Sequence, residues 1–249
     1  MSKLQHIALV VDAIKPGGAE RVITAMARYW SDCDVRVSLI TLKDEPCFYS
    51  LGEKVQLVPL DIAHKSAHAV QGVLNTRHRV RVLRACLREL DPDVVISFFA
   101  DVSSITLLAA RRLDVPVIVS ERNHPRQHII PYRWKLARQL LYRRAERLVV
   151  QSGEMIPFYQ RLGVDTTVIA NPLRQVDVDS QSKRRWILGV GRLTHQKGFD
   201  LLLRAYAASG LYPRWKLVIV GEGEERDKLE QLARDLGVEE GLQMPGLVQ

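Results

Sequence analysis

Short, continuous apolar runs alternate with amphipathic segments along most of this chain, and no other feature limits its fold as strongly. Seven such runs come first, at residues 6–11, 35–42, 55–60, 93–99, 115–120, 147–152 and 167–172. Apolar runs without polar alternation are typical of strands that are buried on both faces of a parallel sheet. Helical patterns separate them at residues 19–30, 76–90, 103–112, 131–146 and 154–162. This part of the chain is therefore predicted to form a doubly wound α/β domain.

The same alternation restarts after a polar segment. Residues 174–185 carry serines and charges without an apolar run, which predicts an interdomain linker. Strand patterns follow at residues 185–191, 215–221 and 242–248, separated by helical patterns at residues 199–210 and 224–237. We therefore expect a first domain at residues 1–173 and the first part of a second, also doubly wound, at residues 186–249. This second unit is predicted to be incomplete, because so small a sheet leaves an edge and an apolar face uncovered.

The composition excludes several classes of protein. Hydrophobic residues make up 47% of the chain and charged residues 26%, which indicates a folded globular protein. No apolar run approaches the ~20 residues of a transmembrane helix, and the start of the chain lacks a signal-peptide cleavage site. The three cysteines are scattered without CxxC spacing, as is typical of reduced thiols in the cytosol. A net charge of +8 points to an anionic partner, such as nucleic acid, a phospholipid surface or a phosphorylated substrate.

Two glycines follow the first predicted strand. Gly17 and Gly18 begin the next helix in the stretch KPGGAER. In open parallel sheets, ligands bind beyond the carboxyl ends of the strands, where helix N-termini point at anions. Paired glycines let the backbone approach such a ligand closely, and they equally suit a tight turn with a glycine N-cap. The stretch is not GxGxxG, which argues against a dinucleotide site.

The stretch VGRLTHQKG places two cations where a later predicted strand ends. Arg192 and Lys197 both follow Gly191, and Gly198 opens the next helix. A guanidinium grips two phosphate oxygens while an ammonium adds a mobile point charge, so the pair suits a diphosphate. Cations in loops are also commonly solvated without any ligand, and both interpretations stay open.

Polar residues also crowd two other strand ends. The stretch SERNHP supplies Arg122, which suits an anion, and His124, which suits a sugar hydroxyl or a phosphate. A loop histidine is also commonly just exposed to solvent. In the turn VGEGE, Gly221, Glu222 and Gly223 suit contacts with a base or a ribose. An acidic helix start explains these three residues equally well.

Two segments carry much of the positive charge. Residues 76–90 and 131–148 place arginines beside leucines and beside Tyr132, Trp134 and Tyr142 at helical spacing. Such helices suit an anionic lipid surface with the aromatic side chains at the interface. They also fit ordinary packed helices with solvated outer faces. We expect no nucleic-acid partner, because the chain has no nucleic-acid motif and no aromatic strand face that stacks bases.

Four stretches, in order, resemble a known family. GGAER, SERN, GRLTHQKGFDLLLRAYA and LVIVGEGEERDKLEQLA look like a GT-B glycosyltransferase of family 4, a group of retaining enzymes. The resemblance covers essentially the whole chain, and GRL-x-x-QKG followed by VGEGEER is its most specific part. It implies a GT-B fold with two Rossmann-like parallel-sheet domains, the second one incomplete. GGAER and SERN look most like members that transfer N-acetylhexosamine or galactose from UDP-sugars in lipid-linked oligosaccharide or cell-surface polysaccharide assembly.

The resemblance implies roles for the donor-side residues. Arg192 and Lys197 would hold the donor diphosphate and stabilise charge as the nucleotide leaves. Gly17 and Gly18 would lie under the diphosphate and the transferred sugar.

Further roles follow for the remaining candidates. His124, or failing it Arg122, would contact the donor sugar near the reacting centre. Asn171 would line the interdomain cleft together with Gly221, Glu222 and Gly223, as part of the donor site.

The resemblance also implies cofactors, partners and location. Transfer in such enzymes resembles a metal-free front-face reaction in which the donor phosphate assists the acceptor hydroxyl. We therefore expect no metal, no other cofactor and no protein nucleophile. The expected partners are a nucleotide-sugar donor, a lipid-linked or glycan acceptor and an anionic membrane surface. The expected location is cytoplasmic, peripheral on the cytoplasmic face of the membrane.

One part of the family pattern is missing. The family carries a glutamate pair later in the second domain, and the chain ends before that region. Glu222 and Glu230 are spaced along the chain as the two glutamates of that pair are, but they lie too early and on the wrong helix. We therefore expect these 249 residues alone to transfer sugar poorly or not at all. The alternatives are a non-catalytic nucleotide- or partner-binding module and a charge-driven nucleic-acid binder, the latter indifferent to Arg192→Ala.

Overall fold

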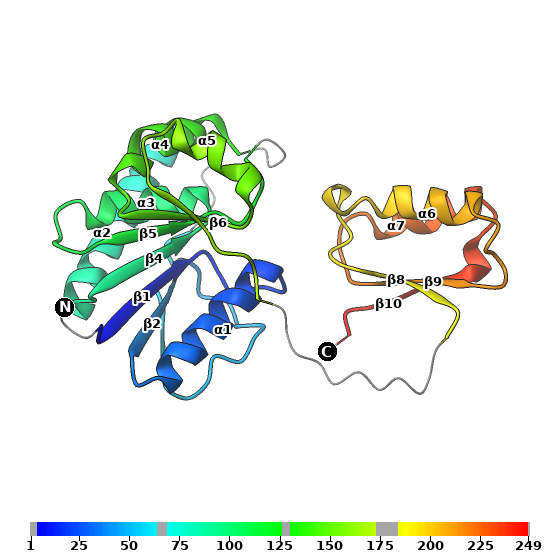
Figure 1. Cartoon of the computed structure of the whole chain (residues 1–249), viewed down its shortest axis with the longest axis horizontal. Coiled ribbons are helices and arrows are strands. Elements are labelled where there is room, and N and C mark those ends of the chain that lie inside the picture. Colours follow the sequence, from blue (N-terminus) through cyan, green and yellow to red (C-terminus); the bar gives the residue numbers. More distant parts are fainter. Residues whose placement is uncertain (1–3, 64–68, 126–129, 173–183, 249) are drawn as a thin grey trace. The chain divides into compact units, whose positions relative to one another are not determined.

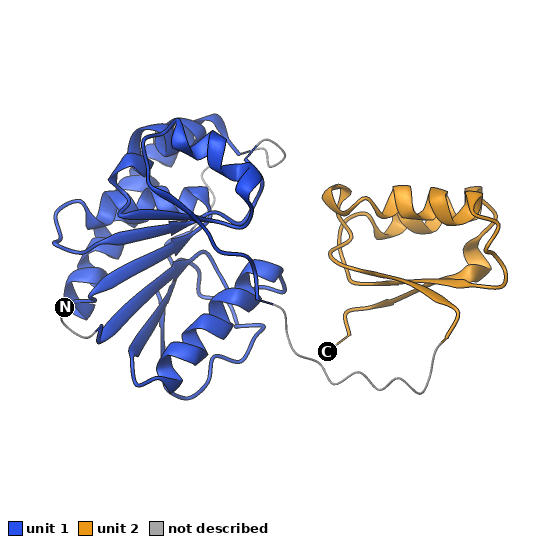
Figure 2. Cartoon of the chain, viewed as in Figure 1, with its two compact units in different colours: residues 1–174 blue, residues 175–249 orange. Residues whose placement is uncertain are grey.

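A computed structural model describes residues 4–63, 69–125, 130–172 and 184–248 of the chain. They belong to two compact units, unit 1 at Met1–Arg174 and unit 2 at Gln175–Gln249 (Figure 2). Each unit has its own parallel sheet and its own hydrophobic core. The predicted linker at residues 174–185 falls almost entirely outside the described residues.

The described strands of unit 1 form one parallel sheet of seven strands, in the order β3-β2-β1-β4-β5-β6-β7. Their bounds are β1 His6–Val11, β2 Arg36–Thr41, β3 Val55–Pro59, β4 Val94–Phe98, β5 Val117–Ser120, β6 Arg147–Val150 and β7 Thr166–Val168. Each strand lies within one of the predicted apolar runs or begins one residue before it. The prediction of a parallel sheet is confirmed, because every described strand pair of unit 1 is parallel. Strand β1 is buried along its whole length, whereas the edge strands β3 and β7 are partly exposed.

The helices of unit 1 follow the predicted order with shifted ends. They are α1 Gly18–Asp32, α2 Ala69–Leu90, α3 Ala100–Ala110, α4 Tyr132–Leu141 and α5 Ile156–Gln160, with 3₁₀ turns at Tyr142–Arg144 and Gly153–Met155. Helix α2 begins at Ala69 rather than at Thr76, whose hydroxyl instead donates to the Gly72 carbonyl one turn earlier at 2.8 Å. Helix α4 ends at Leu141, earlier than the pattern predicts.

The helices of unit 1 cover the sheet from two sides (Figure 1). Helices α2, α3 and α4 pack over one face, and α1 packs over the other. Of the aromatics predicted at a lipid interface, Trp134 is 8% exposed and Tyr142 is fully buried, both in the core on the α2–α4 side. That prediction is wrong for these two residues, since they supply core volume. Tyr132 is 79% exposed.

Unit 2 contains a smaller parallel sheet of three described strands in the order β10-β9-β8. Its elements are β8 Trp186–Val190, α6 Phe199–Ala208, β9 Lys216–Val220, α7 Arg226–Asp235 and β10 Leu242–Gly246, with 3₁₀ turns at His195–Lys197 and Glu239–Gly241. Figure 1 shows α6 and α7 on the same face of this sheet. The predicted fold class is confirmed: two parallel α/β sheets, the second smaller than the first.

None of the helices in the described part of the chain is both long enough and apolar enough to cross a bilayer.

Candidate functional site

The carboxyl ends of β1, β5 and β7 lie at the same edge of the sheet in unit 1, because all of its strands are parallel. Hydrogen bonds join the segments that follow β5, β6 and β7 to one another and to helix α1. Arg122 Nη1 donates to Asn171 Oδ1 at 2.7 Å, and Gln151 Nε2 donates to the same oxygen at 3.2 Å. Arg21 Nη2 of α1 donates to the Pro172 carbonyl at 3.3 Å. The structure therefore brings the predicted site residues Arg122 and Asn171 into direct contact.

The glycine pair lies at the start of α1. The Tyr49 hydroxyl lies 3.2 Å from the Gly17 nitrogen and 3.1 Å from the Gly17 oxygen, which holds the turn in place. Gly17 has a φ of −172°, an extended conformation open to any residue, and a Cβ there would meet the end of the Glu20 side chain. A Cβ on Gly18 would enter open space. Backbone strain therefore does not require these glycines, and the open space is compatible with a ligand close to the helix start.

Arg122 and His124 have different surroundings. The guanidinium of Arg122 lies 5.3 Å from the centroid of the Phe98 ring, and burial lowers the pKa of Arg122 below its usual value. His124 lines a hollow of about 350 Å³ together with Glu154 and Phe158. The roles predicted for Arg122 and His124 at a donor sugar stay predictions.

Glu121 is the residue that sequence reasoning missed. It directly follows β5, is only 4% exposed, and accepts a hydrogen bond on Oε1 from the Tyr142 hydroxyl at 2.5 Å. Burial raises the pKa of Glu121 to about 7, although the Tyr142 bond and the charge of Arg138 act in the opposite direction. The available signal was an acidic residue placed directly after a fully apolar strand. A buried carboxyl that titrates near neutrality is common at functional sites.

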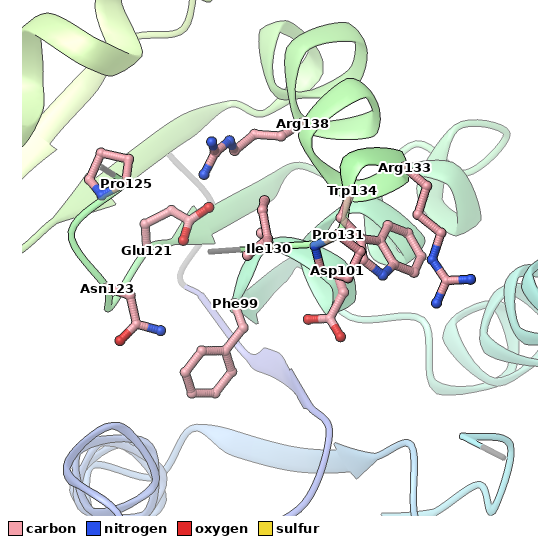
Figure 3. A pocket seen from close by; sticks show the side chains of 11 residues that line it. Phe99, Asp101, Glu121, Asn123, Pro125, Ile130, Pro131, Arg133, Trp134 and Arg138 are labelled. Atoms are coloured by element: carbon pink, nitrogen blue, oxygen red, sulfur yellow. The ribbon is translucent and has the colours of Figure 1, made fainter. Parts of the chain in front are cut away.

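A cavity of about 410 Å³ opens beside Glu121 (Figure 3). Its polar lining comprises Asp101, Glu121, Asn123, Arg133 and Arg138. Figure 3 shows Glu121 and Arg138 directed toward each other on one side of the cavity. The cavity lies at the carboxyl ends of β4 and β5, where open parallel sheets bind their ligands.

In unit 2, the loop after β8 holds both predicted cations. Leu193 is fully buried and anchors the loop in the core of unit 2. The chain then forms the 3₁₀ turn His195–Lys197 and enters α6 through Gly198, whose φ of 64° suits glycine. The side chain of Lys197 lies over Gly191, and Arg192 is exposed. Within the described part of the chain, no hydrogen bond or ion pair engages the charged end of either side chain.

The glycines after β9 are required by the contact between two loops. Gly221 and Gly223 have φ values of 147° and 159°. A Cβ on Gly221 would strike the Gly191 carbonyl, and a Cβ on Gly223 would strike the backbone of Leu193. Their absence of side chains therefore lets the loop after β9 pack directly against the loop that carries Arg192. Donor contact by these glycines stays a prediction.

Glu222 is engaged by a neighbouring arginine. Arg226 donates to both of its carboxylate oxygens at 2.6 and 3.0 Å, and these hydrogen bonds lower the pKa of Glu222. Arg226 also donates to Glu230 at 3.1 Å. The two glutamates with the family's pair spacing therefore share one local ion-pair partner.

The comparisons with known proteins agree with this architecture. Residues 16–174 match the family described as Glycosyltransferase Family 4, and residues 174–249 match Glycosyl transferases group 1. The chain belongs to glycosyltransferase family 4.

Individual relatives resemble the chain over most of its length. An α-1,4-N-acetyl-D-galactosaminyltransferase from Campylobacter jejuni, named for a diphospho-undecaprenol-linked glycan, is 28% identical over 94% of this chain and 66% of its own length. The lipopolysaccharide outer core galactosyltransferase WaaB has a TM-score of 0.69 at 19% identity, over 98% of this chain and 69% of that one. Anabaena HepE, solved with UDP and glucose, has a TM-score of 0.73 at 16% identity, over 99% of this chain and 70% of that one. The chain thus spans about two thirds of the length of these proteins.

Glu121→Gln should make the stability of unit 1 less dependent on pH. The raised pKa of Glu121 means that the folded state binds more protons than the unfolded state between about pH 4.5 and 7. Wild-type stability therefore falls as the pH rises through this window, by on the order of 3 kcal/mol. Glutamine keeps an acceptor for Tyr142 and cannot ionise, so the variant should lack this fall. Denaturant unfolding on either side of the window measures it.

Glu146→Gln is the matched control, because Glu146 is an exposed carboxyl in the same unit. It should keep the wild-type pH dependence. Identical pH profiles for wild type and Glu121→Gln would show that Glu121 keeps its ordinary titration in the folded chain.

Proposed function

We propose that this chain supplies the acceptor-side domain and the donor-diphosphate loop of a retaining glycosyltransferase. The enzyme moves a hexose or N-acetylhexosamine from a UDP-sugar to a lipid-linked or polysaccharide acceptor in cell-surface glycan assembly. One observation carries the proposal: Arg192 and Lys197 extend from a loop that is anchored on both sides, by Leu193 and by the contact with Gly221 and Gly223.

The chemistry of a nucleotide leaving group fits these two cations. Negative charge develops on the diphosphate as the bond to the sugar breaks, and fixed cations stabilise that charge. The guanidinium of Arg192 suits two phosphate oxygens at once, while the ammonium of Lys197 adds a point charge. Because backbone hydrogen bonds and the buried side chain of Leu193 fix the backbone of the loop, little reorganisation is needed when the donor binds.

The donor and acceptor classes are supported by the relatives. One is named for transfer of N-acetylgalactosamine to a diphospho-undecaprenol-linked glycan, one for galactose transfer to lipopolysaccharide, and one was solved with UDP and glucose. We propose UDP as the nucleotide and a neutral hexose or N-acetylhexosamine as the transferred group. We also propose that transfer needs no metal, and that the 249 residues alone transfer sugar poorly.

Calorimetric titration of the chain with UDP, GDP and ADP tests the proposal. We expect selective binding of UDP, unchanged by excess chelator. Arg192→Ala and Lys197→Ala should each weaken UDP binding roughly tenfold or more, since a hydrogen bond to a charged group contributes about 1.5 to 3 kcal/mol.

Arg214→Ala is the matched control, because Arg214 is an exposed arginine of the same unit at the amino end of β9. It should leave UDP affinity unchanged. An equal loss in this control, or no nucleotide binding by the folded chain, would contradict the diphosphate role. The second result would favour a non-catalytic partner-binding module.

We further propose that unit 1 docks on the cytoplasmic face of a membrane through α4. Tyr132, Leu136 and Leu140 are exposed and follow one another at intervals of four residues, so they form one row on the helix. Lys135 and Arg143 are exposed nearby. An apolar row flanked by cations suits an anionic lipid surface, which is where a lipid-linked acceptor would be met.

Tyr132→Glu should weaken binding to vesicles of anionic phospholipid roughly fivefold or more, since one charge near such a surface is worth about 1 kcal/mol. Sedimentation with the vesicles measures the change. Tyr29→Glu is the matched control, because Tyr29 is 67% exposed on α1, which covers the opposite face of the sheet. Equal weakening by both substitutions would contradict docking through α4.

A further inference from the structure

The cavity beside Glu121 is not used by the proposed donor contacts, and it has the properties of a binding site. Its volume of about 410 Å³ falls within the range of about 300 to 1,000 Å³ that is usual for small-molecule sites. Phe99, Ile130 and Trp134 supply apolar surface, next to the polar side chains already described. Ligand sites typically combine such an apolar wall with a few convergent polar groups.

Two buried polar side chains at this cavity have unused hydrogen-bonding capacity. Glu121 receives the Tyr142 hydroxyl on Oε1, and no described residue donates to its second oxygen. Arg138 is only 6% exposed, and its Nε is buried without a partner among the described residues. The Arg138 guanidinium is held over the ring of Phe158 at 4.8 Å. A buried donor such as Arg138 Nε is expensive to leave unsatisfied, and a ligand hydroxyl would satisfy it. The second oxygen of Glu121, which is not among the buried unpaired atoms, would accept another hydroxyl.

The backbone at the cavity is strained in a way that favours a functional explanation. Phe99 joins β4 to α3 with a φ of 69° and a ψ of 149°, a combination that is almost confined to glycine. Such a conformation costs on the order of 1 to 3 kcal/mol for a bulky residue. Strain of this size is concentrated at ligand-binding and active sites.

The charges around the cavity select the class of ligand. The carboxyl groups of Asp101 and Glu121 disfavour an anionic ligand, while the guanidinium groups of Arg133 and Arg138 disfavour a cationic one. A purely apolar ligand would cover all four groups without satisfying them. A neutral, hydroxyl-rich ring satisfies both carboxyls and both guanidiniums, and it places its apolar face against Phe99 or Trp134.

We propose that this cavity is a saccharide subsite, in which Glu121 and Arg138 bind hydroxyl groups of a neutral hexose or N-acetylhexosamine unit of the acceptor glycan. The assignment to the acceptor rests on the proposed function, whereas saccharide binding by the cavity does not depend on it. Asp101, which is exposed at the first turn of α3, accepts a further hydroxyl. Tyr142 positions Glu121 and leaves one carboxyl oxygen for the sugar.

Saturation-transfer NMR on the whole chain tests this subsite, with the methyl α-glycosides of N-acetylgalactosamine and galactose as probes. We expect at least one glycoside to bind. Glu121→Leu should abolish that binding, Glu121→Gln should restore part of it, and Asp101→Asn should weaken it about fivefold. Asp101 is exposed, so this variant keeps the test valid if Glu121→Leu fails to fold.

Asp114→Asn is the matched control, because Asp114 is an exposed carboxyl beyond the far end of α3. It should bind the glycosides like wild type. Binding of neither glycoside, binding that all variants retain, or displacement of the glycoside by inorganic phosphate would each overturn the subsite.

UDP titration of the same samples separates the two proposals. Binding of UDP without glycoside binding contradicts the saccharide subsite alone. Glycoside binding that depends on Glu121, without UDP binding, contradicts the donor-diphosphate proposal alone.

Discussion

The backbone contact between the loops after β8 and β9 is the constraint on which the proposed donor site depends. Gly191 N donates to Val220 O at 3.0 Å, Leu193 N donates to Glu222 O at 2.9 Å, and Glu225 N returns a bond to Leu193 O at 3.0 Å. These bonds continue the parallel pairing of β8 and β9 beyond the ends of the strands. Leu193 then fills the core, and Arg192 directly before it is exposed. The loop is therefore fixed by its backbone and by Leu193, while Arg192 stays accessible.

In unit 1 the parallel sheet also fixes where the loops lie, but some of the residues in those loops destabilise the folded state. Its parallel strands bring separate loops to one edge, where Arg122 and Asn171 meet. A buried carboxyl at Glu121 and a strained backbone at Phe99 both oppose folding, and the large apolar core around them offsets that cost. Features that destabilise a domain while lining a cavity are the ones for which a function is the natural explanation.

Much of the architecture could be predicted from the sequence because buried parallel strands leave a strong local signal. The apolar runs anticipated each described strand of unit 1, and the glycine, arginine and lysine of the loop after β8 stood at a recognisable strand end. Residues that depend on distant partners could not be predicted in this way. Glu121 accepts a hydrogen bond from a tyrosine 21 residues later in the chain, and the hydrogen-bond partner of Arg122 lies 49 residues away.

Helical spacing was also misleading about exposure. Trp134 and Tyr142 share a helical segment with the exposed Tyr132, and only the packing against the core decides which of them is buried. Periodicity identifies an amphipathic helix, but a large aromatic residue near its boundary can belong to either face. The need for glycine after β9 was equally hidden from the local sequence. The backbone atoms that leave no room for a Cβ there belong to the loop after β8.

The central claim is that the loop after β8 holds the diphosphate of a nucleotide-sugar. A titration of the ¹⁵N-labelled chain with UDP, followed residue by residue through its amide signals, tests this most directly. The account predicts that the largest shifts fall on Gly191 to Gly198, while the amino ends of β8 and β9 stay unchanged. Shifts centred on those amino ends, or none in the loop while UDP is bound, would contradict it.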